Sequence, residues 1–138
     1  MDDLPTLCLA RPGPGLESAW PLVRKLVQGA CDRGLPYTPQ DVLQHLRGGK
    51  WRLFLAHSQD RGIEAICIIE IVDYPKGRTL EIPICTGNDR GRWLKHFETI
   101  REQAKSEGCT RIAALTRPGW AKILPGGKVT HVLWECPL

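Results

Sequence analysis

A strand-to-helix junction in the second half of the chain carries the residues best suited to bind a charged ligand. Residues 80–85 read LEIPIC and predict a strand, which ends at Thr86, Gly87 and Asn88, and an amphipathic helix is expected to follow at once. The first N–H groups of a helix have no partner within that helix. The junction is therefore a candidate site for an anion such as a phosphate group.

Positive charge is concentrated near the same junction. The 138-residue chain has a net charge of +4, with ten basic and ten acidic residues in 1–88 but nine basic and four acidic residues in 89–128. This excess suits a phosphate-bearing ligand or a nucleic acid, and the alternative is a solvated helix face. The i,i+4 neighbours Glu98 and Glu102, and Arg101 and Lys105, are like-charged, so pairing at that spacing does not explain the pattern.

The six cysteines predict reduced thiols rather than disulfides or a metal site. No two of them have C-x-x-C spacing, and no histidine follows at an interval typical of zinc ligands. Cys67 and Cys85 lie within apolar strand patterns, where a free cysteine behaves as a small hydrophobic residue. We therefore expect no bound metal.

Two helices are expected in the first half of the chain, after a short strand at residues 6–10. Apolar residues at helical spacing predict a helix over 16–31, with Pro21 in its first turn, where a missing N–H costs little. The segment Thr38-Pro39-Gln40-Asp41 predicts the capped start of a second helix that ends before Gly48.

The remaining elements predict a mixed sheet with helices on both faces. Strands are expected at 51–57, 63–72 and 80–85, a long helix over 90–106, and a strand at 112–115. A helical turn at 120–124 and a last strand around His131 complete the chain. The order is β-α-α-β-β-β-α-β-α-β in one domain, residues 1–138, of the α/β class. Trp51, Trp93, Trp120 and Trp134 fall on apolar faces and are expected in the core.

This order and these lengths resemble the GNAT (Gcn5-related N-acetyltransferase) fold over essentially the whole chain. The resemblance implies that acetyl-CoA lies between the fourth and fifth strands, its pyrophosphate held by backbone amides entering the third helix. The family pattern there is Q/R-x-x-G-x-G/A, and Arg90-Gly91 resembles its middle, although bulky side chains replace the second small residue. The cofactor-binding residues implied are Cys85, Gly87, Asn88, Arg90, Gly91 and Arg92.

The same resemblance points to a catalytic residue. A glutamate on the fourth strand often acts as the general base in this family, which makes Glu81 the candidate, with Glu70 second. His131 could also serve as a base near neutral pH. The tyrosine that many members carry as a general acid is replaced here by Lys122 or Ile123.

Short segments favour one part of this superfamily. Gly108-Cys109, Arg117-Pro118-Gly119-Trp120 and the Gly-Lys before the last strand are similar to GNAT-like proteins of tailed phages and prophages. We therefore expect an acetyl-CoA-dependent N-acyltransferase that acts on a small-molecule or protein amine, with a site that departs from the family pattern. The alternative is a non-catalytic protein of the same fold that acts in virion assembly or as an adaptor binding a phage or host protein.

The remaining expectations concern location and other partners. No apolar run is long enough to span a membrane, and the N-terminus does not read as a signal peptide, so we expect a protein of the host cytoplasm or of the virion. We expect no membrane partner. The predicted helix offers too few aligned aromatic residues for sequence-specific nucleic-acid binding.

Overall fold

The central sheet joins strands that are neighbours in sequence. The computed structural model describes residues 4–115 and 126–138. Within them the sheet has the strand order β1-β2-β3-β4-β5, with β4 and β5 parallel and the other pairs antiparallel. The strands are β1 (Thr6–Ala10), β2 (Arg52–Ser58), β3 (Gly62–Tyr74), β4 (Gly77–Gly87) and β5 (Arg111–Ala114).

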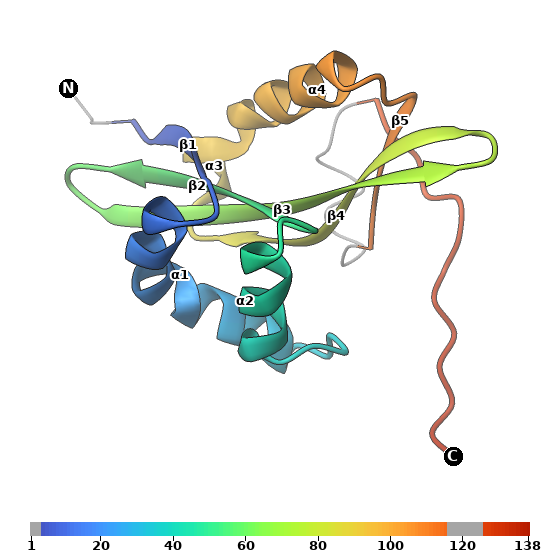
Figure 1. Ribbon diagram of the computed structural model, residues 1–138, viewed down its shortest axis with the longest axis horizontal. Coiled ribbons are helices and arrows are strands. Elements are labelled where there is room, and N and C mark those ends of the chain that lie inside the picture. The colour runs from blue at the N-terminus through green and yellow to red at the C-terminus, as the bar shows by residue number, and fades with distance from the viewer. Residues whose placement is uncertain (1–3, 116–125) are drawn as a thin grey trace.

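Helices cover both faces of this sheet, as predicted. On one face lie α1 (Pro14–Asp32) and α2 (Pro39–Arg47), and on the other lie α3 (Arg90–Trp93), the 3-10 helix η1 (Leu94–His96) and α4 (Phe97–Ser106) (Figure 1). Each face has its own core, one built on Leu53, Ile66 and Ile68, the other on Phe54 and Ile69. None of the described helices combines the length and the apolarity needed to cross a bilayer.

The first helix begins earlier than predicted. It starts at Pro14, whose fixed φ suits the first helical position, after Gly13 with a φ of 109°. Pro21 therefore lies inside the helix and not in its first turn, so the expected placement is wrong. The apolar stripe that includes Leu16, Val23 and Val27 is fully buried and offsets the backbone hydrogen bond that Pro21 removes.

The predicted cap of the second helix is confirmed. The Thr38 hydroxyl accepts a hydrogen bond from the Asp41 N–H at 3.2 Å, and the Asp41 carboxylate accepts one from the Thr38 N–H at 2.9 Å. This reciprocal capping box satisfies two N–H groups that the helix leaves free. Just past the C-terminal end of α4, Gly108 has a φ of 77°, as expected for a glycine that ends a helix.

The long helix expected over residues 90–106 is broken into three pieces. The Trp93 indole N–H turns back to the Asn88 carbonyl at 2.7 Å, and the His96 ring bonds the Pro5 carbonyl at 2.8 Å. These two anchors on either side of Leu94 impose a tighter 3-10 turn between α3 and α4. The predicted apolar stripe is retained, because Trp93, Ile100 and Ala104 are all buried.

The β3–β4 hairpin contains one irregularity in its pairing. From its turn, Tyr74 lies opposite Gly77 and Glu70 opposite Glu81. Between Ile68 and Glu70 the register shifts, because Ile82 and Pro83 of β4 together face Ile69. Proline has no N–H to donate to a sheet and is tolerated at such a bulge.

The last predicted strand is absent from the described residues. Residues 127–138 have no regular secondary structure, and they extend away from the sheet (Figure 1). Trp134, predicted to be buried, is 81% exposed, whereas Trp51 and Trp93 are buried as expected. An apolar alternation forms a strand when a neighbouring edge pairs with it, and here no described strand does so. Trp120 and the predicted turn at 120–124 lie outside the described residues.

The capping box makes a prediction for stability. Thr38→Ala should lower the free energy of unfolding by about 1 kcal/mol, because the Asp41 N–H loses its acceptor. Urea denaturation followed by circular dichroism measures this change. Thr38→Ser keeps the hydroxyl and should be close to the parent; an equal loss in both variants would assign the effect to the threonine methyl group.

Candidate functional site

Strand β5 is short and pairs with only the first half of β4. Their parallel pairing runs from Thr79 opposite Arg111 to Ile82 opposite Ala114. Strand β4 then continues to Gly87, still paired with β3 but with no partner in β5. The side of β4 that faces β5 is therefore open over residues 83–87 in the described part of the chain. An unpaired strand edge offers backbone N–H and C=O groups to an extended ligand.

The end of β4 is fixed against β3 by a glycine. A Cβ at Gly87 would lie 2.5 Å from the Ala65 Cβ and 2.6 Å from the Glu64 carbonyl oxygen. The next N–H, that of Asn88, donates to the same Glu64 carbonyl at 2.9 Å. Gly87 is thus required for close packing, which holds the backbone of the junction in one place.

The turn into α3 uses an unusual backbone conformation. Asp89 has a φ of 53°, in the left-handed region where residues other than glycine are uncommon. Its carbonyl accepts the Arg92 N–H at 3.0 Å, and its carboxylate pairs with Arg61 at 3.1 Å. Because α3 has four residues, its dipole is much weaker than that of the long helix predicted here.

A buried ion pair ties α3 to β3. Arg92 donates to Glu64 through Nε at 2.6 Å and through Nη2 at 3.2 Å, and the two side chains are 11% and 4% exposed. These hydrogen bonds, with a smaller contribution from Ser58, lower the pKa of Glu64 to about 2. The Arg92 guanidinium is thus engaged inside the protein, so Arg92 would serve a ligand through its backbone.

The other predicted cofactor-binding residues lie at the surface of the junction or beneath it. Asn88, Arg90 and Gly91 are exposed, and a Cβ at Gly91 would meet no atom within 4 Å. Cys85 lies beneath α3 and η1, in the core on the α4 face. The space at Gly91 leaves its backbone open to a ligand.

Part of the basic excess is neutralised locally. Arg101 pairs with Glu98 at 3.7 Å and Lys105 with Glu102 at 3.5 Å, both at i,i+3 spacing. From the sequence we considered only i,i+4 neighbours, so these i,i+3 pairs were not predicted. Such exposed pairs contribute little energy, yet they reduce the net field of α4.

The predicted base, Glu81, lies on β4 one residue before its pairing with β5 ends. It accepts a hydrogen bond from the Tyr74 hydroxyl, which raises the pKa of Tyr74. The Arg111 guanidinium lies 5.6 Å from the centre of the Tyr74 ring. Glu70, opposite Glu81, accepts the Trp51 indole N–H at 3.0 Å. Glu81 is therefore a carboxylate held in position beside a phenol.

The junction and Glu81 occupy two ends of one strand. Gly87 lies six positions after Glu81, which corresponds to roughly 20 Å in an extended chain. A ligand that reaches both must be long and narrow, with its anionic group at the junction. This arrangement suits a carrier with phosphates at one end and a reactive group at the other.

The sequence did not identify Tyr74 and Arg111 as neighbours of Glu81. Tyr74 lies at the hairpin turn and Arg111 at the start of β5, where each has an ordinary structural explanation. Their proximity to Glu81 follows from the hairpin register, which could have been counted outward from the turn. His131 lies in the exposed C-terminal segment, bonded to Thr130 at 2.9 Å. Lys122 and Ile123 lie outside the described residues.

The fold is shared with solved acetyltransferase structures. The aminoglycoside N-acetyltransferase AAC(6')-Iy in complex with CoA matches 99% of this chain and 97% of its own, with 13% identity and a TM-score of 0.72. An acetyltransferase of Trypanosoma brucei matches 97% of this chain and 99% of its own, with 12% identity and a TM-score of 0.72.

An aminoglycoside acetyltransferase from an uncultured soil metagenomic sample, in complex with sisomicin, has 8% identity and a TM-score of 0.71, over 98% of this chain and 97% of its own. No protein-family model and no curated protein matches the sequence. The matches confirm the predicted α/β GNAT fold, with its mixed sheet and helices on both faces. At these identities they establish the fold, and the chemistry must be argued from the residues.

The buried ion pair makes a prediction about acid stability. The folded-state pKa of Glu64 lies near 2, below its ordinary value of 4.5. Its stabilising effect is therefore complete above pH 4.5 and is lost as the pH falls toward 2. Glu64→Gln should lower the free energy of unfolding at neutral pH by about 3 kcal/mol, because Arg92 loses its charged partner.

Urea denaturation at several pH values tests both effects. The difference between the parent and Glu64→Gln should shrink as the pH falls from 4.5 toward 2. Asp73→Asn is the matched control, because Asp73 pairs with Arg78 at an exposed site and should change stability little. If the stability difference between the parent and Glu64→Gln did not change with pH, the ion pair would not be the source of the acid sensitivity.

Proposed function

We propose that this protein is an N-acyltransferase that uses acetyl-CoA as the acyl donor. The observation that carries the proposal is the edge of β4 that β5 leaves unpaired after Ile82 in the described part of the chain, on the fold shared with acetyltransferases. One of these neighbours was solved with CoA. The unpaired edge runs along β4 to the exposed junction, and its length suits an extended acyl carrier.

The residues of the junction fit the phosphate end of acetyl-CoA. Backbone N–H groups between Gly87 and Arg92 would bind the pyrophosphate. The contact of Gly87 with β3 holds the start of this segment in place. Gly91 leaves space for a group to approach the backbone, and Arg90 adds positive charge. Cys85 would contribute from β4 below the junction. The Asp89 carboxylate is paired with Arg61, which reduces its repulsion of a pyrophosphate.

The reacting end would lie near Glu81. In the proposed reaction a substrate amine attacks the thioester carbon directly, and Glu81 takes the proton from the amine, either directly or through a water molecule. The Tyr74 hydroxyl orients this carboxylate. Glu81 lies one residue before the last β4–β5 pair, next to the start of the unpaired edge of β4.

The acceptor is proposed to be a primary amine of a small molecule or of a protein. Two of the similar structures are aminoglycoside acetyltransferases, which supports testing aminoglycosides first. The short motifs around Gly108 and Arg117 support an origin in a phage or prophage, with the protein acting in the host cytoplasm.

The exposed C-terminal segment supports a second candidate function. Val132, Leu133 and Trp134 are 87%, 67% and 81% exposed, which is unusual for large apolar side chains so close together. A non-catalytic protein that binds a phage or host protein, in virion assembly or as an adaptor, would use such a segment. Absence of acetyl-CoA binding in the parent would favour this second candidate.

The junction can be tested with a pair of variants at one position. Gly91→Glu should abolish acetyl-CoA binding measured by calorimetry, because it adds bulk and negative charge where the pyrophosphate would lie. Gly91 is not in the left-handed region and its Cβ position is open, so both this variant and Gly91→Ala should fold. Gly91→Ala should bind more tightly than Gly91→Glu. Equal affinity in the parent and Gly91→Glu would contradict the proposed site.

The role of Glu81 makes a kinetic prediction. Glu81→Gln keeps an oxygen for the Tyr74 hydroxyl but removes the base, so acetyl transfer to an accepted amine should fall about 100-fold in kcat. Its affinity for acetyl-CoA should not change. Thiol release from acetyl-CoA measures the rate.

Glu70→Gln is the matched control for Glu81→Gln. It replaces the opposite carboxylate of the same strand pair and keeps an acceptor for the Trp51 indole. Its kcat should stay close to that of the parent. An equal fall in both variants would indicate that the charge of the pair matters and that Glu81 is not the base.

A further inference from the structure

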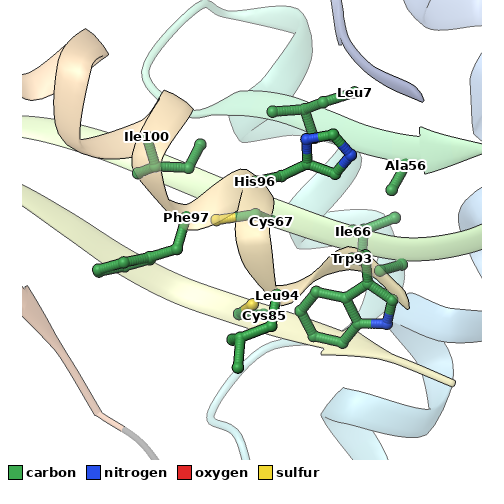
Figure 2. Close-up of a pocket in the computed structure, with 11 residues that line it drawn as sticks. Leu7, Ala56, Ile66, Cys67, Cys85, Trp93, Leu94, His96, Phe97 and Ile100 are labelled. Atoms are coloured by element: carbon green, nitrogen blue, oxygen red, sulfur yellow. The ribbon is translucent and has the colours of Figure 1, made fainter. Parts of the chain in front are cut away.

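Two cysteines lie side by side in the middle of the sheet. Cys67 of β3 is directly opposite Cys85 of β4, and the two thiols are hydrogen-bonded to each other. Both are reduced and partly exposed. Their sulfur atoms lie on the same face of the sheet, beneath the segment that carries Trp93, Leu94 and Phe97 (Figure 2). The proposed acyl transfer does not use the chemistry of either thiol.

The backbone already places these cysteines at disulfide distance. Residues directly opposite in an antiparallel pair have Cα atoms about 4.5 Å or 5.5 Å apart, depending on the type of pair. Disulfides need Cα separations of about 4.4 to 6.8 Å. Pairing on both sides of the two cysteines is regular, with Ile66 opposite Thr86 and Ile68 opposite Ile84. A bond between the sulfurs would require no change in register.

A small cavity gives access to the two thiols. It has a volume of about 40 Å³, and Cys67 and Cys85 are part of its lining together with Leu7, Trp93 and Phe97. A cavity of this size holds a molecule about as large as water. Hydrogen peroxide is of that size, whereas a low-molecular-weight thiol such as glutathione is far larger. The cavity therefore has room for hydrogen peroxide beside the two cysteines.

The two thiols are chemically unequal. The hydrogen bond from Cys67 to the Cys85 sulfur lowers the pKa of Cys85, because it stabilises the thiolate. The same contact, together with burial, raises the pKa of Cys67. A thiolate is the nucleophile in reactions with peroxides, and a neighbouring thiol can then resolve the product. Cys85 is therefore the candidate for the attacking sulfur and Cys67 the candidate for the resolving one, and variants of the pair can distinguish the two roles.

We propose that Cys67 and Cys85 form a peroxide-reactive dithiol that closes to a reversible cross-strand disulfide. The Cys85 thiolate attacks one oxygen of hydrogen peroxide, the O–O bond breaks, and the departing hydroxide takes a proton to become water. The Cys67 sulfur then attacks the resulting sulfenic acid, the S–S bond forms, and a second water leaves with the Cys67 proton. Two thiols are oxidised by two electrons while one peroxide is reduced to two waters.

The linkage can be mapped on the full parent chain. Trypsin releases residues 62–76 with Cys67 as the sole cysteine, and residues 79–90 with Cys85 as the sole cysteine. After treatment of the reduced protein with hydrogen peroxide and alkylation of the remaining thiols, mass spectrometry should find these two peptides joined. The six free thiols should fall to four, and dithiothreitol should restore all six. This experiment needs neither acetyl-CoA nor an acceptor, so its outcome is independent of the proposed acyl transfer.

Two variants separate the roles of the sulfurs. In Cys67→Ser the resolving thiol is absent, so Cys85 should accumulate as a sulfenic acid that dimedone traps. Cys109→Ser, the control, removes a thiol outside the pair and should still form the 67–85 linkage. The proposal is overturned if the linked peptides contain other cysteines, if the peptides of residues 62–76 and 79–90 stay separate, or if dimedone labels Cys85 no more than Cys31.

Discussion

The ion pair between Glu64 and Arg92 is the contact on which the second half of the structure depends. Its side chains are almost completely buried, so each charge would be costly without the other. The backbone of Glu64 is also engaged, since its carbonyl receives the Asn88 N–H and lies against Gly87. One residue of β3 therefore fixes the end of β4, the turn and the start of α3. The open edge of β4 and the exposed Gly91 keep their relative positions because this residue holds them.

The same anchoring explains why the proposed anion site differs from the one that the sequence suggests. A long helix would supply a strong dipole at Arg90, but the hydrogen bonds of Trp93 and His96 interrupt the helix after one turn. The proposed site relies instead on loop N–H groups and on the edge of β4 that β5 leaves unpaired. Binding energy would come from several short contacts along β4 and the junction, with a smaller share from helix electrostatics.

Sequence patterns predicted most of the fold because they report local physics. The cap at Thr38 and the glycine at Gly108 concern a few neighbouring residues, and both were confirmed. The break after Trp93 depends in part on Pro5, which is distant in sequence from its partner His96. The exposure of Trp134 reflects the lack of a strand neighbour among the described residues. The same difference between local and distant contacts applies to the residues of the candidate site. Glu81 could be proposed from its position on a predicted strand, whereas its contact with Tyr74 required the register of the hairpin.

The bulge at Pro83 divides the β3–β4 hairpin into two zones that differ in pairing register by one residue. On the turn side, opposite residues have numbers that add to 151, as for Glu70 and Glu81, and beyond the bulge the sum is 152, as for Cys67 and Cys85. If the bulge were absent and no residue were lost, the sum would be 151 throughout, and Cys67 would lie opposite Ile84 while Glu70 stayed opposite Glu81. Loss of one residue at the bulge would instead keep Cys67 opposite Cys85, because the deletion removes the extra residue that the bulge accommodates. The thiol pair therefore depends on the match between the bulge and the extra residue of β4, whereas the pairing of Glu81 does not depend on it.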